Sequence, residues 1–243
     1  MKLPNAPLKE VIFEIFWDDN TEDGNTPVDQ GFELALGVFA NKIQTTHPRI
    51  KKIFPNNFPL SLMGKTTHQF WQDEMIWPVV QLGPGVMAIN DTDKSYDWEN
   101  GYFDLIKNCL NFLYESYNSK INIKQLQLKY IDAVDLPPNT DCKSFLKNNL
   151  RIELKNNFET PPILSGFQVN QSFKLDDGST ISLTVNDASN NITQEKSIVW
   201  TTTVTSKEIF DFDGIILWLQ KAHSSSSKMF KDMVDPKFYQ TFL

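Results

Sequence analysis

The stretch WPVVQLGPGVMAIND, from Trp77 to Asp91, contains the strongest fold signal in the chain. Two apolar runs, each long enough for a strand, meet at Gly83-Pro84-Gly85. A phosphate-binding loop would need several backbone N–H groups at the start of a helix, but Pro84 has no N–H to donate. Proline followed by glycine is typical of a type II turn, whose third residue has a positive φ. The stretch therefore predicts two antiparallel strands joined by a tight turn.

The period of the apolar residues predicts the other elements. Alternation of apolar and polar residues between 166 and 205 indicates antiparallel strands with one face in water, and apolar residues three and four apart predict helices. The predicted strands are 11–17, 66–73, 79–90 (folded back at the turn), 126–136, 166–175, 180–186 and 197–205. The predicted helices are 32–46, 102–117 and one that begins after Asp211 or Asp213 and runs to Met233, with a short helical turn at 142–149.

These elements predict an α+β protein whose long helices pack on one face of antiparallel sheet. Helix and strands come twice along the chain, which is compatible with two similar α+β halves. No shift in composition marks a boundary, so residues 1–243 are predicted to form a single α+β unit. The best candidate for a seam is the proline-bearing stretch 136–162, which would separate halves at 1–136 and 163–243.

The charge balance disfavours several classes of partner. The net charge of −7 repels nucleic acids and anionic membranes at long range. The compact basic run Arg49-Ile50-Lys51-Lys52 is the exception, and we interpret it as a solvated helix end or loop. No apolar window is long enough for a membrane span, the amino-terminal sequence does not resemble a signal peptide, and the two cysteines have no metal-site spacing. We expect a cytoplasmic protein with no cofactor, in which Cys109 packs in the core.

Four acidic residues follow the predicted hairpin. Asp91, Asp93, Asp97 and Glu99 could hold a magnesium ion for phosphodiesterase chemistry. Their context is a loop that leads into a helix, where an aspartate is favoured by the helix dipole. We therefore expect them to act locally, and a metal-dependent phosphodiesterase or nuclease stays an alternative.

His223 lies on the apolar stripe of the last predicted helix, beside four consecutive serines. A Ser-His catalytic site needs a nucleophile at a strained turn and a third, orienting group. The helix supplies neither, so we interpret His223 as an interfacial or hydrogen-bonded core residue.

Aromatic residues allow a further alternative. Tryptophans and tyrosines can stack on bases, which would suit a nucleotide or nucleic-acid sensor. Because no interleaved cationic residues accompany them, packing in a core or groove is the preferred interpretation. The residues concerned are Trp71, Trp77, Tyr96, Trp98, Trp200 and Trp218.

Several segments together resemble one sporadically distributed, uncharacterised family of bacterial and archaeal proteins. They are LPNAPLKEVIFEIFW at 3–17, the stretch at 77–91, Tyr96 and Trp98 with Phe103, LKYIDAV at 128–134, and AHSSSSKMFKDMVDPKFYQTF at 222–242. Lys129, Asp132 and Ala222 depart from the family pattern, in which Arg, Asn and Leu are usual. The resemblance spans nearly the whole chain and transfers no catalytic residue. The family's patchy distribution is similar to that of accessory proteins in mobile or defence-linked gene clusters.

These observations predict a non-catalytic protein-binding or adaptor module in a bacterial accessory or defence-linked system. A protein partner is expected, either a neighbouring gene product or a second copy of the chain, and neither nucleic acid nor membrane. The candidate binding surface consists of residues on the last helix, in the aromatic tail and just before the helix at 102–117. These are His223, Ser226, Phe230, Phe238, Tyr239, Phe242, Tyr96 and Trp98.

Overall fold

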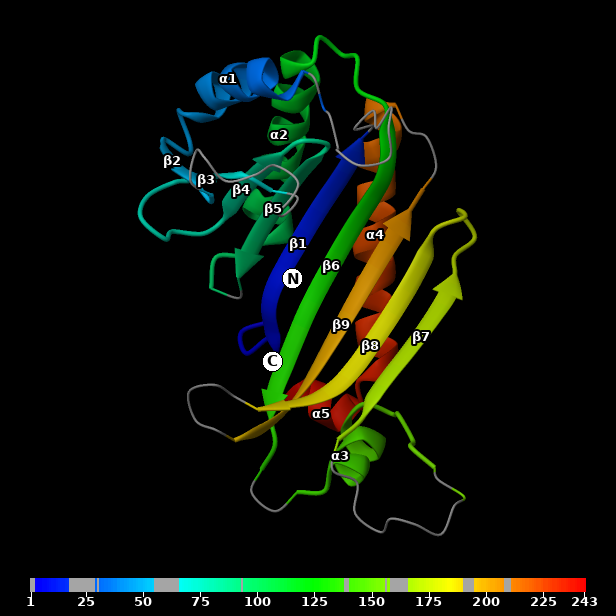
Figure 1. Cartoon of the computed structure of the whole chain (residues 1–243). Helices are drawn as coiled ribbons and strands as arrows, with labels where there is room; N and C mark the ends of the chain where they lie inside the picture. The colour runs from blue at the N-terminus through cyan, green and yellow to red at the C-terminus, as the bar shows by residue number, and fades with distance from the viewer. Residues whose placement is uncertain are drawn as a thin grey trace. The chain divides into compact units, whose positions relative to one another are not determined.

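The fold is seen in a computed structural model of the chain (Figure 1). The structure describes residues 3–17, 29, 31–54, 66–92, 94–137, 140–155, 157, 166–189, 195–207 and 211–243. Within these residues the chain has a mixed α+β fold, as predicted, with nine strands and five α-helices.

The strands form one antiparallel sheet in the order β2-β3-β4-β5-β1-β6-β9-β8-β7. The order begins with β2 and ends with β7, so these two strands are its edges. The strands are β1 (Leu8–Trp17), β2 (Arg49–Lys52), β3 (His68–Trp71), β4 (Val79–Gly83), β5 (Val86–Thr92), β6 (Ile123–Asp135), β7 (Gln168–Lys174), β8 (Thr180–Ser189) and β9 (Lys196–Ser206).

The hairpin predicted around the two glycines is confirmed. Strands β4 and β5 pair as far as Gly83↔Val86, which leaves Pro84 and Gly85 as a two-residue connection. Gly85 has φ 69°, a value that favours glycine because a side chain would clash there. The strands on either side are almost entirely buried, which explains their continuous apolar sequence.

The alternation predicted for the last third of the chain is confirmed for β8 and β9, whereas six of the seven residues of β7 are exposed. In β8 the side chains of Ile181, Leu183 and Val185 are buried, whereas the residues between them are half-buried. Ile198 and Trp200 follow the same period in β9. One face of these strands therefore forms a core, as a period of two requires.

The helices lie close to their predicted positions. The carboxylate of Asp211 accepts a hydrogen bond from the N–H of Gly214, which confirms Asp211 as the cap of the long last helix. Asp97 and Asp141 cap the turn η2 and helix α3 in the same way. The helices are α1 (Phe32–Ile43), α2 (Phe103–Ser116), preceded by the kinked turn η2 (Trp98–Tyr102), α3 (Cys142–Asn149), α4 (Phe212–Met233) and α5 (Pro236–Gln240).

Two elements differ from the expectation. The run Arg49–Lys52, expected to be a helix end or loop, is the edge strand β2. All four of its side chains are exposed, so it has no apolar alternation from which a strand could be predicted. The aromatic tail contains the short helix α5, which begins with Pro236 directly after the cap Asp235.

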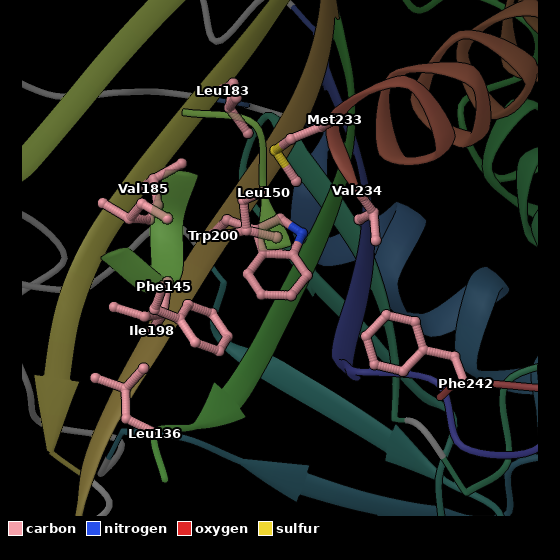
Figure 2. Packing of buried hydrophobic residues seen from close by; sticks show 11 residues of the cluster. Leu136, Phe145, Leu150, Leu183, Val185, Ile198, Trp200, Met233, Val234 and Phe242 are labelled. Carbon is pink, nitrogen blue, oxygen red and sulfur yellow. The ribbon is translucent and has the colours of Figure 1, made fainter. Parts of the chain in front are cut away.

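The described residues divide into two compact units, each built from separate segments of the chain. The first comprises 1–10, 129–204 and 220–243, and the second comprises 11–128 and 205–219. In the first unit, Trp200 lies at the centre of an apolar cluster formed by β8, β9, α3 and the carboxyl-terminal residues (Figure 2).

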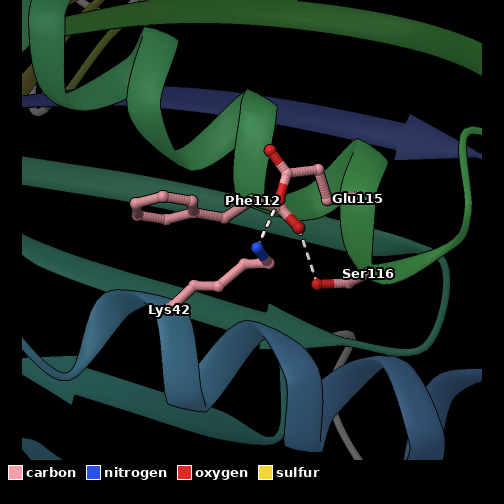
Figure 3. Close-up of polar contacts among 4 residues, drawn as sticks. All are labelled: Lys42, Phe112, Glu115 and Ser116. Carbon is pink, nitrogen blue, oxygen red and sulfur yellow. Dashed lines mark hydrogen bonds and ion pairs between the residues drawn. The ribbon is translucent and has the colours of Figure 1, made fainter.

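In the second unit, α1 packs against both α2 and the sheet. The ring of Phe39 lies 5.4 Å from that of Phe70 on β3 and 6.3 Å from that of Phe112 on α2, measured between centroids. At the surface, Lys42 of α1 forms an ion pair with Glu115 of α2 (Figure 3). Exposed ion pairs contribute little to stability, so we infer that the aromatic contacts hold α1 in place.

The hydroxyl of Tyr102 joins β1 and β5 to the start of α2. It accepts from the N–H of Phe13 at 3.0 Å and donates to the carbonyl of Ile89 at 2.7 Å. Because Tyr102 is buried, water cannot easily replace either bond.

Tyr102→Phe is expected to lower the free energy of unfolding by about 1–3 kcal/mol, because it leaves two buried backbone groups without their partner. The measurement is urea denaturation followed by tryptophan fluorescence. Tyr114→Phe is the matched control, since Tyr114 is only half-buried. Equal stabilities of the two variants would contradict the role of the Tyr102 hydroxyl.

Candidate functional site

The predicted carboxyl-terminal binding residues lie together in the first unit. Phe230 of α4 is nearly parallel to Trp200, with centroids 6.4 Å apart and planes at 19°. Phe238 and Phe242 pack edge to face at 4.9 Å. Phe242 is buried, and Phe230, Phe238 and Tyr239 are partly buried against the apolar cluster of Figure 2. The tail therefore completes the core of this unit.

His223 of α4 is bonded to β6. The hydroxyl of Tyr130 is 2.7 Å from Nδ1 of His223, so this histidine is hydrogen-bonded within the fold, which was one of the two interpretations of its position. Burial lowers the pKa of His223 to about 4, and the positive charge of Lys231 adds a smaller contribution. The imidazole is therefore neutral at physiological pH.

Two further polar residues lie close in sequence to the two partners of the Tyr130–His223 hydrogen bond. Asp132 follows Tyr130 by two residues on β6, so the two share a face of the strand. Ser226 lies one turn after His223 on α4. Both are buried. We call Tyr130, Asp132, His223 and Ser226 the α4–β6 polar group.

Asp132 is the acidic member of the α4–β6 polar group. Burial raises the pKa of its carboxyl to about 7, although the charge of Lys9 and the nearby indole of Trp200 oppose this shift. The indole lies beside the carboxyl without meeting hydrogen-bond geometry, because Nε1 of Trp200 has no hydrogen-bond partner among the described residues.

The two pKa shifts have opposite consequences for stability. The pKa of His223 is depressed, so its contribution to stability is present above pH 6.5 and is lost as pH falls toward 4. The pKa of Asp132 is raised, so its contribution is present below its ordinary value of 3.8 and is lost as pH rises through about 7. The carboxyl of Asp132 therefore titrates near neutral pH inside the fold.

Ser226 does not complete a catalytic arrangement with His223. Its hydroxyl is buried and has no hydrogen-bond partner in the described part of the chain. A nucleophilic serine needs a hydrogen bond to its general base. The serine run consequently supplies a buried polar atom rather than a nucleophile.

Asp91, the first residue of the acidic group after the hairpin, serves local structure. It is buried and accepts from the N–H of Thr92 at 2.8 Å and from the hydroxyl of Ser95. These bonds lie within four residues of the chain, as expected for a loop that leads into a helix.

The other acidic residues of this group show the same local use where the structure describes them. Asp97 accepts from the N–H groups of Glu99 and Asn100 at the start of η2, and Glu99 itself is exposed. Asp93 lies outside the described residues. The residues that are described contain no group of three or more His, Cys, Asp or Glu placed to hold a metal ion.

Tyr96 and Trp98 lie in the second unit and surround the entry to α2. Their rings lie 5.4 Å and 6.4 Å from that of Tyr102, and Trp98 also packs against Phe103 at 5.2 Å. Both side chains are half-buried.

Buried tryptophans cannot serve as surface platforms for base stacking. Four of the six tryptophans of the chain are buried: Trp17, Trp71, Trp200 and Trp218.

Asp29 is a polar centre that the sequence does not reveal. Its Oδ2 atom accepts from Nε1 of Trp17 at 3.1 Å, from the hydroxyl of Tyr117 at 2.5 Å and from the N–H of Gly85 at 3.3 Å. Its Oδ1 atom accepts from the N–H of Gly31 just before α1. Burial and the hydrogen bond to Asp29 raise the pKa of Tyr117, which keeps this tyrosine protonated as a donor.

Asp29 thus joins the end of β1, the β4–β5 turn, the end of α2 and the start of α1. The glycine turn does bind an anionic group through a backbone N–H, but that group is a carboxylate of the same chain. An aspartate shortly before a helix is a capping signal. That signal does not single out Asp29, because four other acidic residues occupy the same polar segment at 18–30.

Comparisons with known proteins give no family assignment. No family model matches the chain, and no curated protein matches it. Among solved structures, the chain is similar to the di-domain ARO/CYC StfQ from the steffimycin biosynthetic pathway, with 9% identity over 92% of this chain and 96% of that chain. The TM-score is 0.20, and a likeness at that level carries no argument about fold or function. No helix in the described ranges has the length and apolar character needed to cross a membrane.

Asp132→Asn is expected to raise the free energy of unfolding relative to wild type more at pH 8 than at pH 5. Between pH 5 and pH 8 the buried carboxyl of Asp132 ionises in wild type, which lowers the free energy of unfolding. The amide of the variant does not ionise. A pKa raised from 3.8 to about 7 makes the difference between the two pH values about 3 kcal/mol at most.

The measurement is denaturant unfolding of both proteins at the two pH values. His223 is present in both, so its own titration cancels in the comparison. A stability difference that is the same at pH 5 and pH 8 would show that Asp132 does not titrate in this range.

Proposed function

We propose that the chain is a cytoplasmic, non-catalytic protein-binding or adaptor module, in the bacterial accessory or defence-linked setting that its sequence resemblance implies. The observation that supports this proposal most directly is an exposed apolar stripe on α1. The binding surface proposed here differs from the carboxyl-terminal residues favoured by the sequence, of which Phe242 is buried and Phe230, Phe238 and Tyr239 are half-buried.

Helix α1 is apolar on two opposite sides. Phe32, Phe39 and Ile43 are buried against the rest of the second unit. On the solvent side, the side chains of Leu34 and Val38 are 81% and 43% exposed. A helix with one buried face normally has polar residues on the other, so folding alone does not explain the exposed pair.

Further exposed apolar residues lie on β2, just after it, and on the β3–β4 connection. Of the nine large apolar side chains that are exposed in the described part of the chain, six lie between residues 34 and 76. Scattered exposed apolar residues are ordinary, but a concentration of them marks interaction sites. We call this set the α1 surface: Leu34, Val38, Ile50, Ile53, Met75 and Ile76.

Two contacts place the strand residues and the β3–β4 connection within the second unit. Ile50 is directly opposite Phe70 in the β2–β3 pair, and the ring of Phe70 packs against Phe39 of α1. Residues directly opposite in an antiparallel pair lie on the same face, so Ile50 lies on the face that α1 covers. The ion pair between Arg49 and Asp73 places the β3–β4 connection beside the start of β2.

The charges around the α1 surface indicate the kind of partner. Arg49, Lys51 and Lys52 are exposed on β2 in a chain whose net charge is −7. A protein with an apolar centre and a rim of carboxylates would match both features. A polyanion such as RNA would match the cations but not the apolar residues.

Two finer features of the architecture belong to the same proposal. We propose that the long helices pack on antiparallel sheet and that residues 1–243 act as a single α+β protein, with 136–162 as a candidate seam. Within the first unit α4 contacts β6 through His223 and β9 through Phe230, and within the second unit α1 contacts β3 through Phe39.

The double variant Leu34→Glu, Val38→Glu is expected to abolish partner binding while changing the free energy of unfolding little, because exposed helix positions tolerate charge. The measurement is co-purification with the tagged full-length chain from its native cells. A protein retained in stoichiometric amount by wild type should be absent from the double variant.

Leu217→Glu is the matched control, since it makes the same change at another exposed apolar position, 59% exposed on α4. It should retain the partner. The proposal fails if the double variant retains the same proteins as wild type. A rise in melting temperature with millimolar Mn²⁺ would instead favour the metal-dependent alternative, since a bound ion stabilises the folded state.

A further inference from the structure

Strand β7 is an edge of the sheet with its hydrogen-bonding side open. It is last in the strand order, and no other strand of the described residues pairs with its outer side (Figure 1). Six of its seven residues are exposed. Such an edge presents a row of backbone donors and acceptors that can pair with another strand.

The pairing with β8 determines which backbone groups point outward. Lys174 pairs with Thr180, and in the next pair the N–H of Leu175 donates to the carbonyl of Ser179. Hydrogen-bonded and non-hydrogen-bonded pairs alternate in an antiparallel ladder, so the odd-numbered residues of β7 bond to β8. The N–H and C=O groups that point away from β8 are those of Gln168, Asn170, Ser172 and Lys174.

The composition of β7 does not protect this edge. Natural edge strands are commonly short, or contain charges, prolines or bulges that prevent pairing. The other edge, β2, follows this rule, with four residues of which three are cationic. Strand β7 has seven residues, a single charge at Lys174 and no proline.

We propose that two copies of the chain join through β7, paired antiparallel about a two-fold axis at Gln171. In this register Gln168 lies opposite Lys174 of the second copy, and Asn170 lies opposite Ser172. All of these residues are even-numbered, so their outward backbone groups meet and exchange hydrogen bonds. The cation of each copy faces a neutral amide.

The apolar residues of β7 fit the same register. Phe173 is 46% exposed, although its partner on β8 is the buried Ile181. With the axis at Gln171, Phe173 of each copy lies opposite Val169 of the other, on the face where the buried residues of β8 lie. Cross-strand pairs of an aromatic and a β-branched residue stabilise a sheet, so the dimer explains why an exposed phenylalanine occupies the edge.

Two neighbouring registers preserve the hydrogen bonding but fit less well. An axis at Ser172 would place Phe173 opposite the polar Gln171. An axis at Asn170 would place Phe173 opposite Phe167, which already packs against the apolar cluster of its own copy. Only the axis at Gln171 pairs all seven residues of β7 with all seven of the second copy.

This self-association does not depend on the α1 surface, since β7 belongs to the first unit and the α1 surface to the second. The two proposals also have different readouts. Self-association is measured on the purified chain alone, whereas the α1 surface is tested by retention of a partner.

In this register Gln171 lies opposite Gln171 of the second copy, which allows a charge-exchange test. Gln171→Lys and Gln171→Glu should each raise the dimer dissociation constant by about twofold to fivefold, because like charges meet at the axis. An equimolar mixture of the two variants should associate at least as tightly as wild type. The measurement is sedimentation velocity of the full chain over a concentration series.

Ser172→Lys is the matched control, because it adds the same charge one residue away, opposite the neutral Asn170 of the second copy. It should weaken the dimer less than Gln171→Lys. The proposal is overturned if wild type is a monomer at every concentration, or if the mixture of Gln171 variants associates no better than either variant alone.

Cysteine cross-linking tests the register directly. Gln171→Cys, in a chain that also carries Cys142→Ser, should form a disulfide-linked dimer on mild oxidation, because a residue on the axis of a non-hydrogen-bonded pair meets itself at disulfide distance. The equivalent variants Asn170→Cys and Ser172→Cys should cross-link more slowly. Faster cross-linking at either of these positions would overturn the register.

Discussion

An antiparallel sheet that begins and ends with a free strand must satisfy or protect the backbone groups along its two edges. This constraint accounts for the contrast between β2 and β7, the two edges of the strand order. Strand β2 is short and cationic, and two residues of the α1 surface, Ile50 and Ile53, lie on it and just after it. Strand β7 is longer and almost uncharged. The charges of β2 thus oppose its pairing with β2 of a second copy, whereas the composition of β7 is compatible with pairing between two copies.

Most of the fold could be predicted because its signals are local. The turn at Gly85 follows from proline and glycine at adjacent positions, and the strands of the last third follow from a period of two. Strand β2 could not be predicted, because an exposed edge strand has no buried face to impose a period on its sequence. The division into two units was equally inaccessible, because each unit is assembled from segments that are distant along the chain.

The polar centres were less predictable than the fold. His223 could be interpreted from its place on an apolar stripe, but its partner Tyr130 is 93 residues away. Asp29 collects donors from residues 12, 56 and 88 positions away, and nothing in its own segment distinguishes it from the acidic residues nearby. The aromatic tail shows the reverse case. Its composition predicts a binding surface. Phe242 is buried, whereas Phe238 and Tyr239 pack against the core and stay half-buried, so these rings are suited to either role.

The two proposed surfaces have a consequence together that neither has alone. A dimer formed through β7 carries two copies of the α1 surface, one for each chain. When the partner is oligomeric or contains two binding motifs, binding at one α1 surface makes binding at the other an intramolecular step. The combined affinity then exceeds that of a single α1 surface without any new contact. An α1 surface of modest size could therefore suffice for an adaptor. The same reasoning requires that loss of β7 pairing weaken binding to a bivalent partner while leaving binding to a monovalent one unchanged.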